Sequence, residues 1–262
     1  MGWVTSRTDP DPPPDVVLRV CGPDRFQLLT PYGYRDPSGR YFGVPAQSGD
    51  PYRPGNSTDL ASVPPPLWGL LASYGHQLRA ALLHDHLCSE IDDADQGMRS
   101  PGASQRAAAY ENRWQADEVF RLALADSAVP WFRRWLFWCG VALARYFLYR
   151  RPAFVVLICQ IAASVAAVVV GVVMLLASRP VEGTPYAWLV VVVLLGASAL
   201  WRRDWPLVLL GSVACLPVCA VWLLGVTTQA LLSMPDYLIW LVSRGRTPPP
   251  TLHPYVRRFP LH

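Results

Sequence analysis

Hydrophobic and polar positions divide the chain into two parts of different character. Up to about residue 150, apolar residues occur in short runs or at helical spacing, and charged or Pro-rich segments separate them. From Ala153 onward they form long runs almost without charge. Helical or alternating spacing is typical of a folded soluble domain, whereas about 20 consecutive apolar residues are enough to span a bilayer. The pattern therefore predicts a soluble domain followed by a membrane region.

The beginning of the first part predicts a small β region. Residues 1–14 are rich in Pro and Asp, and we expect them to be disordered. Short β-like runs follow at 16–20, 26–34 and 40–44. The turn residues at 36–39, Asp-Pro-Ser-Gly, predict a hairpin connection between the last two runs. A Pro-rich loop over 55–66 then separates the strands from the helices.

Helical periodicity predicts a compact core of three helices at 76–91, 104–125 and 131–149. His84 lies at the edge of the apolar face of the first helix. Asp117 falls inside the apolar stripe of the second helix, so we expect it to be buried. The third helix is aromatic and amphipathic, and could pack on the first two or lie along a bilayer surface. The predicted fold class of residues 15–150 is thus α+β.

The second part predicts an all-α transmembrane bundle of three or four helices over residues 151–243, followed by a tail at 244–262. Residues 153–177 contain no charged side chain and form the clearest span. Further apolar runs occupy 186–200, 206–226 and 227–242, and the last is interrupted by Pro and Asp. Whether this fourth run crosses the membrane or lies at its surface decides between three and four helices.

Composition supports a membrane protein. Of the residues, 52% are hydrophobic and 16% are charged, against about 25% charged in a typical soluble domain. The formal net charge of +4 comes from the apolar part, where arginines flank the spans. By the positive-inside tendency, we expect the soluble domain and both termini in the cytoplasm, at the plasma membrane. The lipid bilayer is the expected partner; without a basic face, nucleic acid is not.

Three short blocks carry ionisable residues in a fixed order. They are Thr58-Asp59-Leu60-Ala61-Ser62-Val63-Pro64, Leu83-His84-Asp85-His86-Leu87 and Ala116-Asp117-Glu118-Val119-Phe120, and Val44-Pro45-Ala46 precedes the first. Over residues 15–150 these blocks resemble a family of phage and bacterial proteins catalogued as domain of unknown function 1353. The resemblance implies a domain boundary and candidate residues, but no particular reaction. The insertion at 47–57 is a departure from the family pattern.

The candidate residues suggest a possible chemistry. A buried carboxylate such as Asp117 needs a partner, and the simplest partner is His84 on the neighbouring helix. Such a pair would orient the imidazole as a general base for water, which makes His84 and Asp117 the candidate catalytic residues. Asp85 points away from His84 on the same helix and, with Asp59, could bind a divalent cation through oxygen ligands.

Two functions remain open at this point. The first is a membrane-anchored, metal-assisted hydrolase that uses His84, Asp117, Asp59 and Asp85. The second is a non-enzymatic, phage-derived structural or assembly domain tethered to the membrane, in which the same side chains hold helices and loop together. A zinc site on His84 and Cys88 would lack two further ligands. His86 is expected to face solvent.

Overall fold

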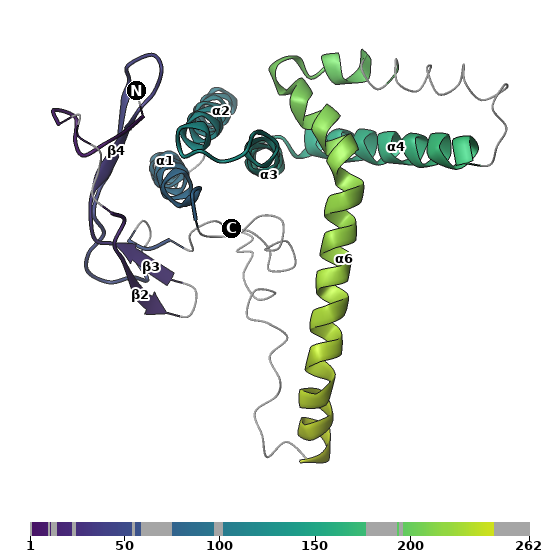
Figure 1. The fold of residues 1–262 in the computed structure, drawn as a ribbon. Coiled ribbons are helices and arrows are strands. Elements are labelled where there is room, and N and C mark those ends of the chain that lie inside the picture. Colours follow the sequence, from purple (N-terminus) through teal and green to yellow (C-terminus); the bar gives the residue numbers. More distant parts are fainter. Residues whose placement is uncertain are drawn as a thin grey trace. The chain divides into compact units, whose positions relative to one another are not determined.

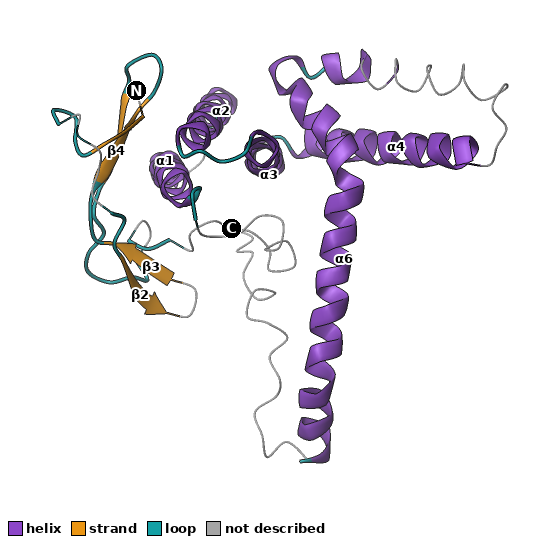
Figure 2. Cartoon of the chain, viewed as in Figure 1, coloured by secondary structure: helices purple, strands orange, loops and turns teal. Residues whose placement is uncertain are grey.

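The structure is a computed structural model that describes residues 2–9, 11, 15–22, 25–53, 56–58, 75–96, 102–176, 193 and 196–243 (Figure 1). Described residues up to Cys215 form one compact unit, and those from Leu216 onward belong to a second. Within the first unit the strands precede the helices (Figure 2). This order confirms the predicted α+β class.

The larger sheet has three antiparallel strands in the order β1 (Gly2–Val4), β4 (Tyr32–Arg35), β5 (Tyr41–Val44). The predicted turn joins β4 to β5. Asp36 Oδ1 accepts hydrogen bonds from the backbone N–H groups of Ser38 and Arg40 at 2.9 and 3.0 Å. Gly39 adopts a φ of +84°, which glycine tolerates best.

A second, two-stranded sheet pairs β2 (Leu18–Gly22) with β3 (Arg25–Leu28). The single β run predicted at 26–34 is therefore two strands, which belong to different sheets. The break falls at Leu29-Thr30-Pro31, where the apolar alternation is interrupted and a proline precedes β4.

The expectation of a disordered N-terminus is wrong for Gly2–Val4, which form β1. The Trp3 ring packs against Tyr32 and Tyr34 at centroid distances of 5.6 and 5.1 Å. Its Nε1 donates a hydrogen bond to Ser127 Oγ at 3.1 Å. These partners are distant in sequence, so local composition could not indicate them.

The helical core consists of α1 (Leu78–Gln96), α2 (Ala103–Asp126) and α3 (Trp131–Tyr149), close to the three predicted helices. Helix α2 packs against both α1 and α3, while β5 contacts α1 and β1 contacts α2 (Figure 1). Helix α3 therefore packs on the other two helices, which was one of the two predicted alternatives. The buried side chains between these elements include Ala80, Leu83, Val119, Ala123, Leu124, Trp138 and Ala142.

The apolar part differs from the predicted bundle. Helix α4 (Arg151–Leu176) forms at the first predicted span. After the short 3-10 helix η2 (Arg202–Asp204), the runs predicted at 206–226 and 227–242 form one continuous helix, α6 (Trp205–Val242). Prolines 217 and 235 lie inside it. A proline removes one backbone hydrogen bond without ending a helix that its apolar neighbours continue.

Within the described ranges, one helix, Arg202–Val242, is long and apolar enough to cross a membrane, and Arg151–Ala167 forms a shorter apolar helix. The predicted bundle of three or four spans is thus reduced to one candidate span. Two of the predicted crossings are halves of α6, and most of the run at 186–200 lies outside the described residues.

Candidate functional site: a buried ionic chain and a polar pocket

The predicted pair of His84 and Asp117 forms in the contact between α1 and α2. His84 Nε2 lies 3.0 Å from Asp117 Oδ1. Asp117 is only 1% exposed, as its place in the apolar stripe of α2 predicted. The ring of Phe120 packs against the imidazole with a centroid distance of 4.9 Å. The pair is therefore enclosed by the helical core.

The pair continues into a longer set of buried charges. Arg145 Nε on α3 donates to Asp117 Oδ2 at 2.7 Å, and Arg145 Nη2 donates to Asp204 Oδ1 at 3.0 Å. The hydroxyl groups of Tyr146 and Tyr110 donate to Asp204 Oδ2 at 2.7 and 3.2 Å. We call His84, Asp117, Arg145 and Asp204 the buried ionic chain. It runs from α1 through α2 and α3 to η2, directly before α6.

Charge balance in the buried ionic chain favours a protonated His84. Two carboxylates and one guanidinium leave a net negative charge, which a protonated His84 neutralises. Burial lowers the pKa of His84, but neighbouring Cys88 and Asp117 outweigh burial and raise that pKa to about 10. Burial likewise opposes the charge of Arg145, while Asp117 and Asp204 raise its pKa. At neutral pH His84 is an imidazolium that donates to Asp117, whereas a general base must be a neutral imidazole.

Asp85, the next residue on α1, faces another side of the helix. Its Oδ2 accepts a hydrogen bond from Thr58 Oγ1 at 2.6 Å. Thr58 in turn forms a β-bridge with Phe26 of β3. Asp85 thus connects α1 to the strand region, while His84 connects α1 to α2. Asp59, the other predicted metal ligand, lies outside the described residues.

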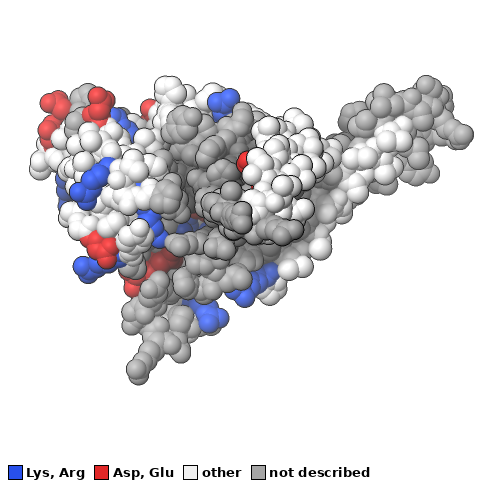
Figure 3. Space-filling view, turned by 90° about the horizontal axis from the view of Figure 1, so that it is seen from below, with Lys and Arg blue, Asp and Glu red and all other residues white. Residues whose placement is uncertain are grey.

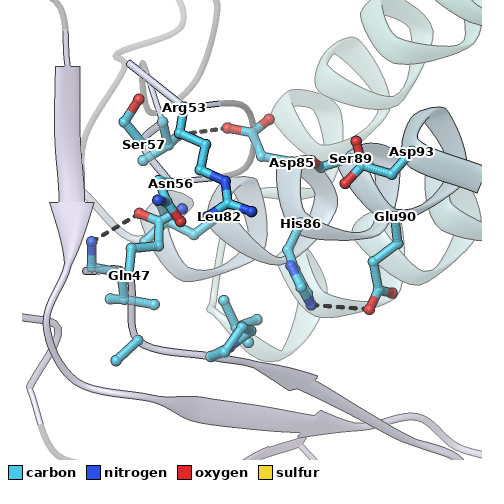
Figure 4. Close-up of a pocket in the computed structure, with 15 residues that line it drawn as sticks. Gln47, Arg53, Asn56, Ser57, Leu82, Asp85, His86, Ser89, Glu90 and Asp93 are labelled. Atoms are coloured by element: carbon cyan, nitrogen blue, oxygen red, sulfur yellow. Dashed lines mark hydrogen bonds and ion pairs between the residues drawn. The ribbon is translucent and has the colours of Figure 1, made fainter. Parts of the chain in front are cut away.

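Asp85 lines a pocket of about 450 Å³ between α1 and the segment after β5 (Figure 4). His86, Glu90 and Asp93 line it from α1, and Arg53 projects into it from the opposite segment (Figure 4). His86 Nε2 lies 3.5 Å from Glu90 Oε1. His86 is therefore a half-buried pocket residue, although the sequence led us to expect it in solvent.

The described part of the chain contains no complete metal-binding site. No group of three or more His, Cys, Asp or Glu side chains there could hold a metal ion. Cys88 Sγ does lie 3.7 Å from His84 Nδ1, but a zinc site would need further ligands. Ligation by Asp59 and Asp85 stays a prediction.

Sequence reasoning missed Arg145 and Asp204. Arg145 could have been noticed because it is an isolated charge among the aromatic residues of α3. Asp204 could have been noticed because it is an acidic residue directly before the long apolar run, after Arg202 and Arg203. Such charges require partners of opposite sign. The pocket residues could also have been noticed in the sequence, because polar side chains at 85, 86, 89, 90 and 93 share a face of the helix.

Residues 26–141 match the model of a family described as "Protein of unknown function (DUF1353)". No curated protein and no solved structure matches the chain. The matched range contains His84, Asp85 and Asp117, and it ends before Arg145 and Asp204.

Proposed function

We propose that this chain, which carries a DUF1353 domain at residues 26–141, is a membrane-anchored, non-enzymatic binding or assembly protein. The observation that carries the proposal is the buried ionic chain, which connects the core of the domain to the first residues of α6 through Arg145 and Asp204. In this proposal His84 and Asp117 hold the domain against the start of its anchor.

Exposed apolar surface supports the membrane anchor. Large hydrophobic side chains of α6 are exposed around the helix, among them Leu216, Trp222, Leu224, Leu231, Leu232, Leu238 and Ile239. On the face shown in Figure 3, charged side chains gather over one part of the described surface, while another part is almost entirely uncharged. A helix that is apolar all round must bury itself in protein or in lipid, and the described protein leaves these side chains uncovered.

Arginines flank α6 at both ends and bear on its orientation. Arg150 and Arg151 precede or begin α4, and Arg202 and Arg203 directly precede α6, whereas Arg244 and Arg246 follow it. Basic residues at the ends of membrane helices favour the cytoplasmic side. The proposed orientation keeps the DUF1353 domain and the arginines before α6 in the cytoplasm, at the plasma membrane. A single span then places the C-terminus on the other side, so the two termini do not share one side.

The metal-assisted hydrolase predicted from the sequence has less support. It requires His84 as a base beside Asp85 and Asp59. In the described residues, the His84 side chain contacts α2 and the protonated form is favoured, whereas Asp85 bonds to Thr58 beside the pocket. The pocket is instead the place where a non-enzymatic domain would take a polar ligand or peptide. Because Asp59 is not described, the hydrolase stays a prediction.

The proposal can be tested by extraction and proteolysis of the full chain in membranes. We expect the chain to resist alkaline extraction. The Asp204→Asn variant should also stay in the membrane but should be cleaved faster in the segment between α2 and α3, because the domain is held less firmly. Glu111→Gln, which breaks the exposed pair with Arg203, is the matched control. Alkaline release of the chain contradicts the anchor, and equal cleavage of both variants contradicts the role of the buried ionic chain.

A further inference from the structure

Helix α3 has a second face that the core does not use. One side of the helix buries Trp138, Ala142 and Arg145 within the first unit. Yet three large apolar side chains on other sides of the helix remain exposed: Phe147 at 40%, Phe132 at 42% and Leu148 at 52%. Trp131, which is 61% exposed, is the first residue of the helix and lies on the same side as Trp138. A soluble helix of this length would normally place polar side chains on its outer face.

The charges around this face have a single sign. Residues 127–176 contain no Asp or Glu. Apart from buried Arg145, this segment holds Arg133, Arg134, Arg150 and Arg151, and no ion pair joins any of these four to a carboxylate within the described ranges. The Arg151 guanidinium instead lies over the Phe147 ring, 5.8 Å from its centroid. The Arg150 guanidinium lies over the buried Tyr110 ring of α2, 3.9 Å from its centroid. Arg133, Arg134 and Arg151 therefore remain beside the aromatic rings on the outward side of a segment that has no carboxylate.

We propose that the outward face of α3 lies in the headgroup region of a bilayer that contains anionic lipid. Aromatic rings favour the membrane interface, and arginines next to them can pair with lipid phosphates. The surface is also continuous with an apolar helix, because α4 begins at Arg151 and exposes Val155 and Val156 within its second turn. This inference rests on the proposed membrane anchor and extends it from the spanning helix to the soluble domain.

Photocross-linking of the full chain in lipid vesicles tests the inference. The photoreactive residue p-benzoylphenylalanine replaces Phe132 or Phe147 on α3, Leu232 on α6, or the exposed Tyr52 of the DUF1353 domain as a matched aromatic control. Vesicles contain phosphatidylcholine alone or with phosphatidylglycerol, and lipid adducts are detected by mass spectrometry. We expect adducts at Phe132 and Phe147 that increase several-fold with phosphatidylglycerol, and none at Tyr52.

The Leu232 position separates this inference from the anchor on which it rests. Adducts at Leu232 without adducts on α3 overturn the inference and leave the anchor intact. No adducts at Leu232 overturn the anchor itself. Equal labelling of α3 in both lipid mixtures contradicts the role of the arginines. If labelling does increase with phosphatidylglycerol, Arg133→Gln should reduce that increase. Protein adducts in place of lipid adducts on α3 would mean that another chain covers this face.

Discussion

Arg145 and Asp204 form a buried ion pair although they are 59 positions apart in the sequence. Arg145 Nη2 lies 3.0 Å from Asp204 Oδ1, and both side chains are almost fully enclosed. The hydroxyl groups of Tyr146 and Tyr110 satisfy the other carboxylate oxygen. Burial of two charges costs desolvation energy, which the ion pair itself and the tyrosine hydrogen bonds offset. Of the three guanidinium nitrogens of Arg145, Nη1 has no hydrogen-bond partner within the described part of the chain. It couples the helical core to the residue directly before α6.

The first prediction concerns removal of one partner of this pair. Asp204→Asn leaves Arg145 without one of its two carboxylates, and a broken buried pair typically costs about 3–5 kcal/mol. Denaturant unfolding of the full chain in one detergent measures the change. Glu111→Gln, which breaks the exposed pair with Arg203, should cost less than about 1 kcal/mol. Equal losses in the two variants would contradict the account.

The second prediction compares the two tyrosines. Tyr146→Phe removes the 2.7 Å hydrogen bond to Asp204 and should lower the free energy of unfolding by about 1–3 kcal/mol. Tyr110→Phe removes a longer bond of 3.2 Å, so its loss should be smaller. Both substitutions keep an aromatic ring beside the Arg145 guanidinium, so the difference between them reports the hydrogen bonds. The reverse order in the same unfolding experiment would be inconsistent with this geometry.

Local sequence patterns predicted the helical core well. The apolar spacing that places Asp117 inside the stripe of α2 also implied a partner, and His84 on α1 is that partner. Patterns could not predict Arg145 or Asp204 as members of the same network, because their pairing depends on how α3 and η2 pack. They also could not join the runs at 206–226 and 227–242 into α6, because Pro235 and Asp236 made the second run look interrupted, whereas the helix tolerates both Pro217 and Pro235.

The β region had the same limitation. Trp3 forms its contacts with Tyr32 and Tyr34, so a strand at the N-terminus exists only through long-range packing. Likewise, His86 faces a pocket because the segment after β5 lies opposite α1, which helix periodicity does not report. Burial along a helix was thus predictable, but not which distant segment covers its polar face.

The third prediction concerns pH. Because the folded pKa of His84 is raised from 6.5 to about 10, its stabilising contribution is complete below 6.5 and is lost as pH rises towards 10. The free energy of unfolding should therefore fall over this range in the parent chain. His84→Gln should remove that part of the pH dependence and should be less stable at neutral pH. Parallel pH profiles for the two chains would refute the assigned protonation.

The fourth prediction addresses metal binding at Asp85. In a non-enzymatic domain, added Mg²⁺, Mn²⁺ or Ca²⁺ should shift the unfolding temperature of the parent chain and of Asp85→Asn equally. The substitution itself should destabilise the chain by about 1.5–3 kcal/mol, because it weakens the 2.6 Å bond from Thr58 to a charged carboxylate. A metal-dependent shift that disappears in Asp85→Asn, and also in Asp59→Asn, would favour the predicted metal site.

The protonation state of His84 tests the account most directly. Nitrogen NMR of the histidine-labelled full chain, with His84→Gln to assign the signal among the five histidines, follows the imidazole during a pH titration. The account predicts an imidazolium that persists well above 6.5 and titrates at about 10, held by Asp117. A neutral imidazole that titrates near 6.5 would contradict it, because that is the form in which His84 could act as a general base.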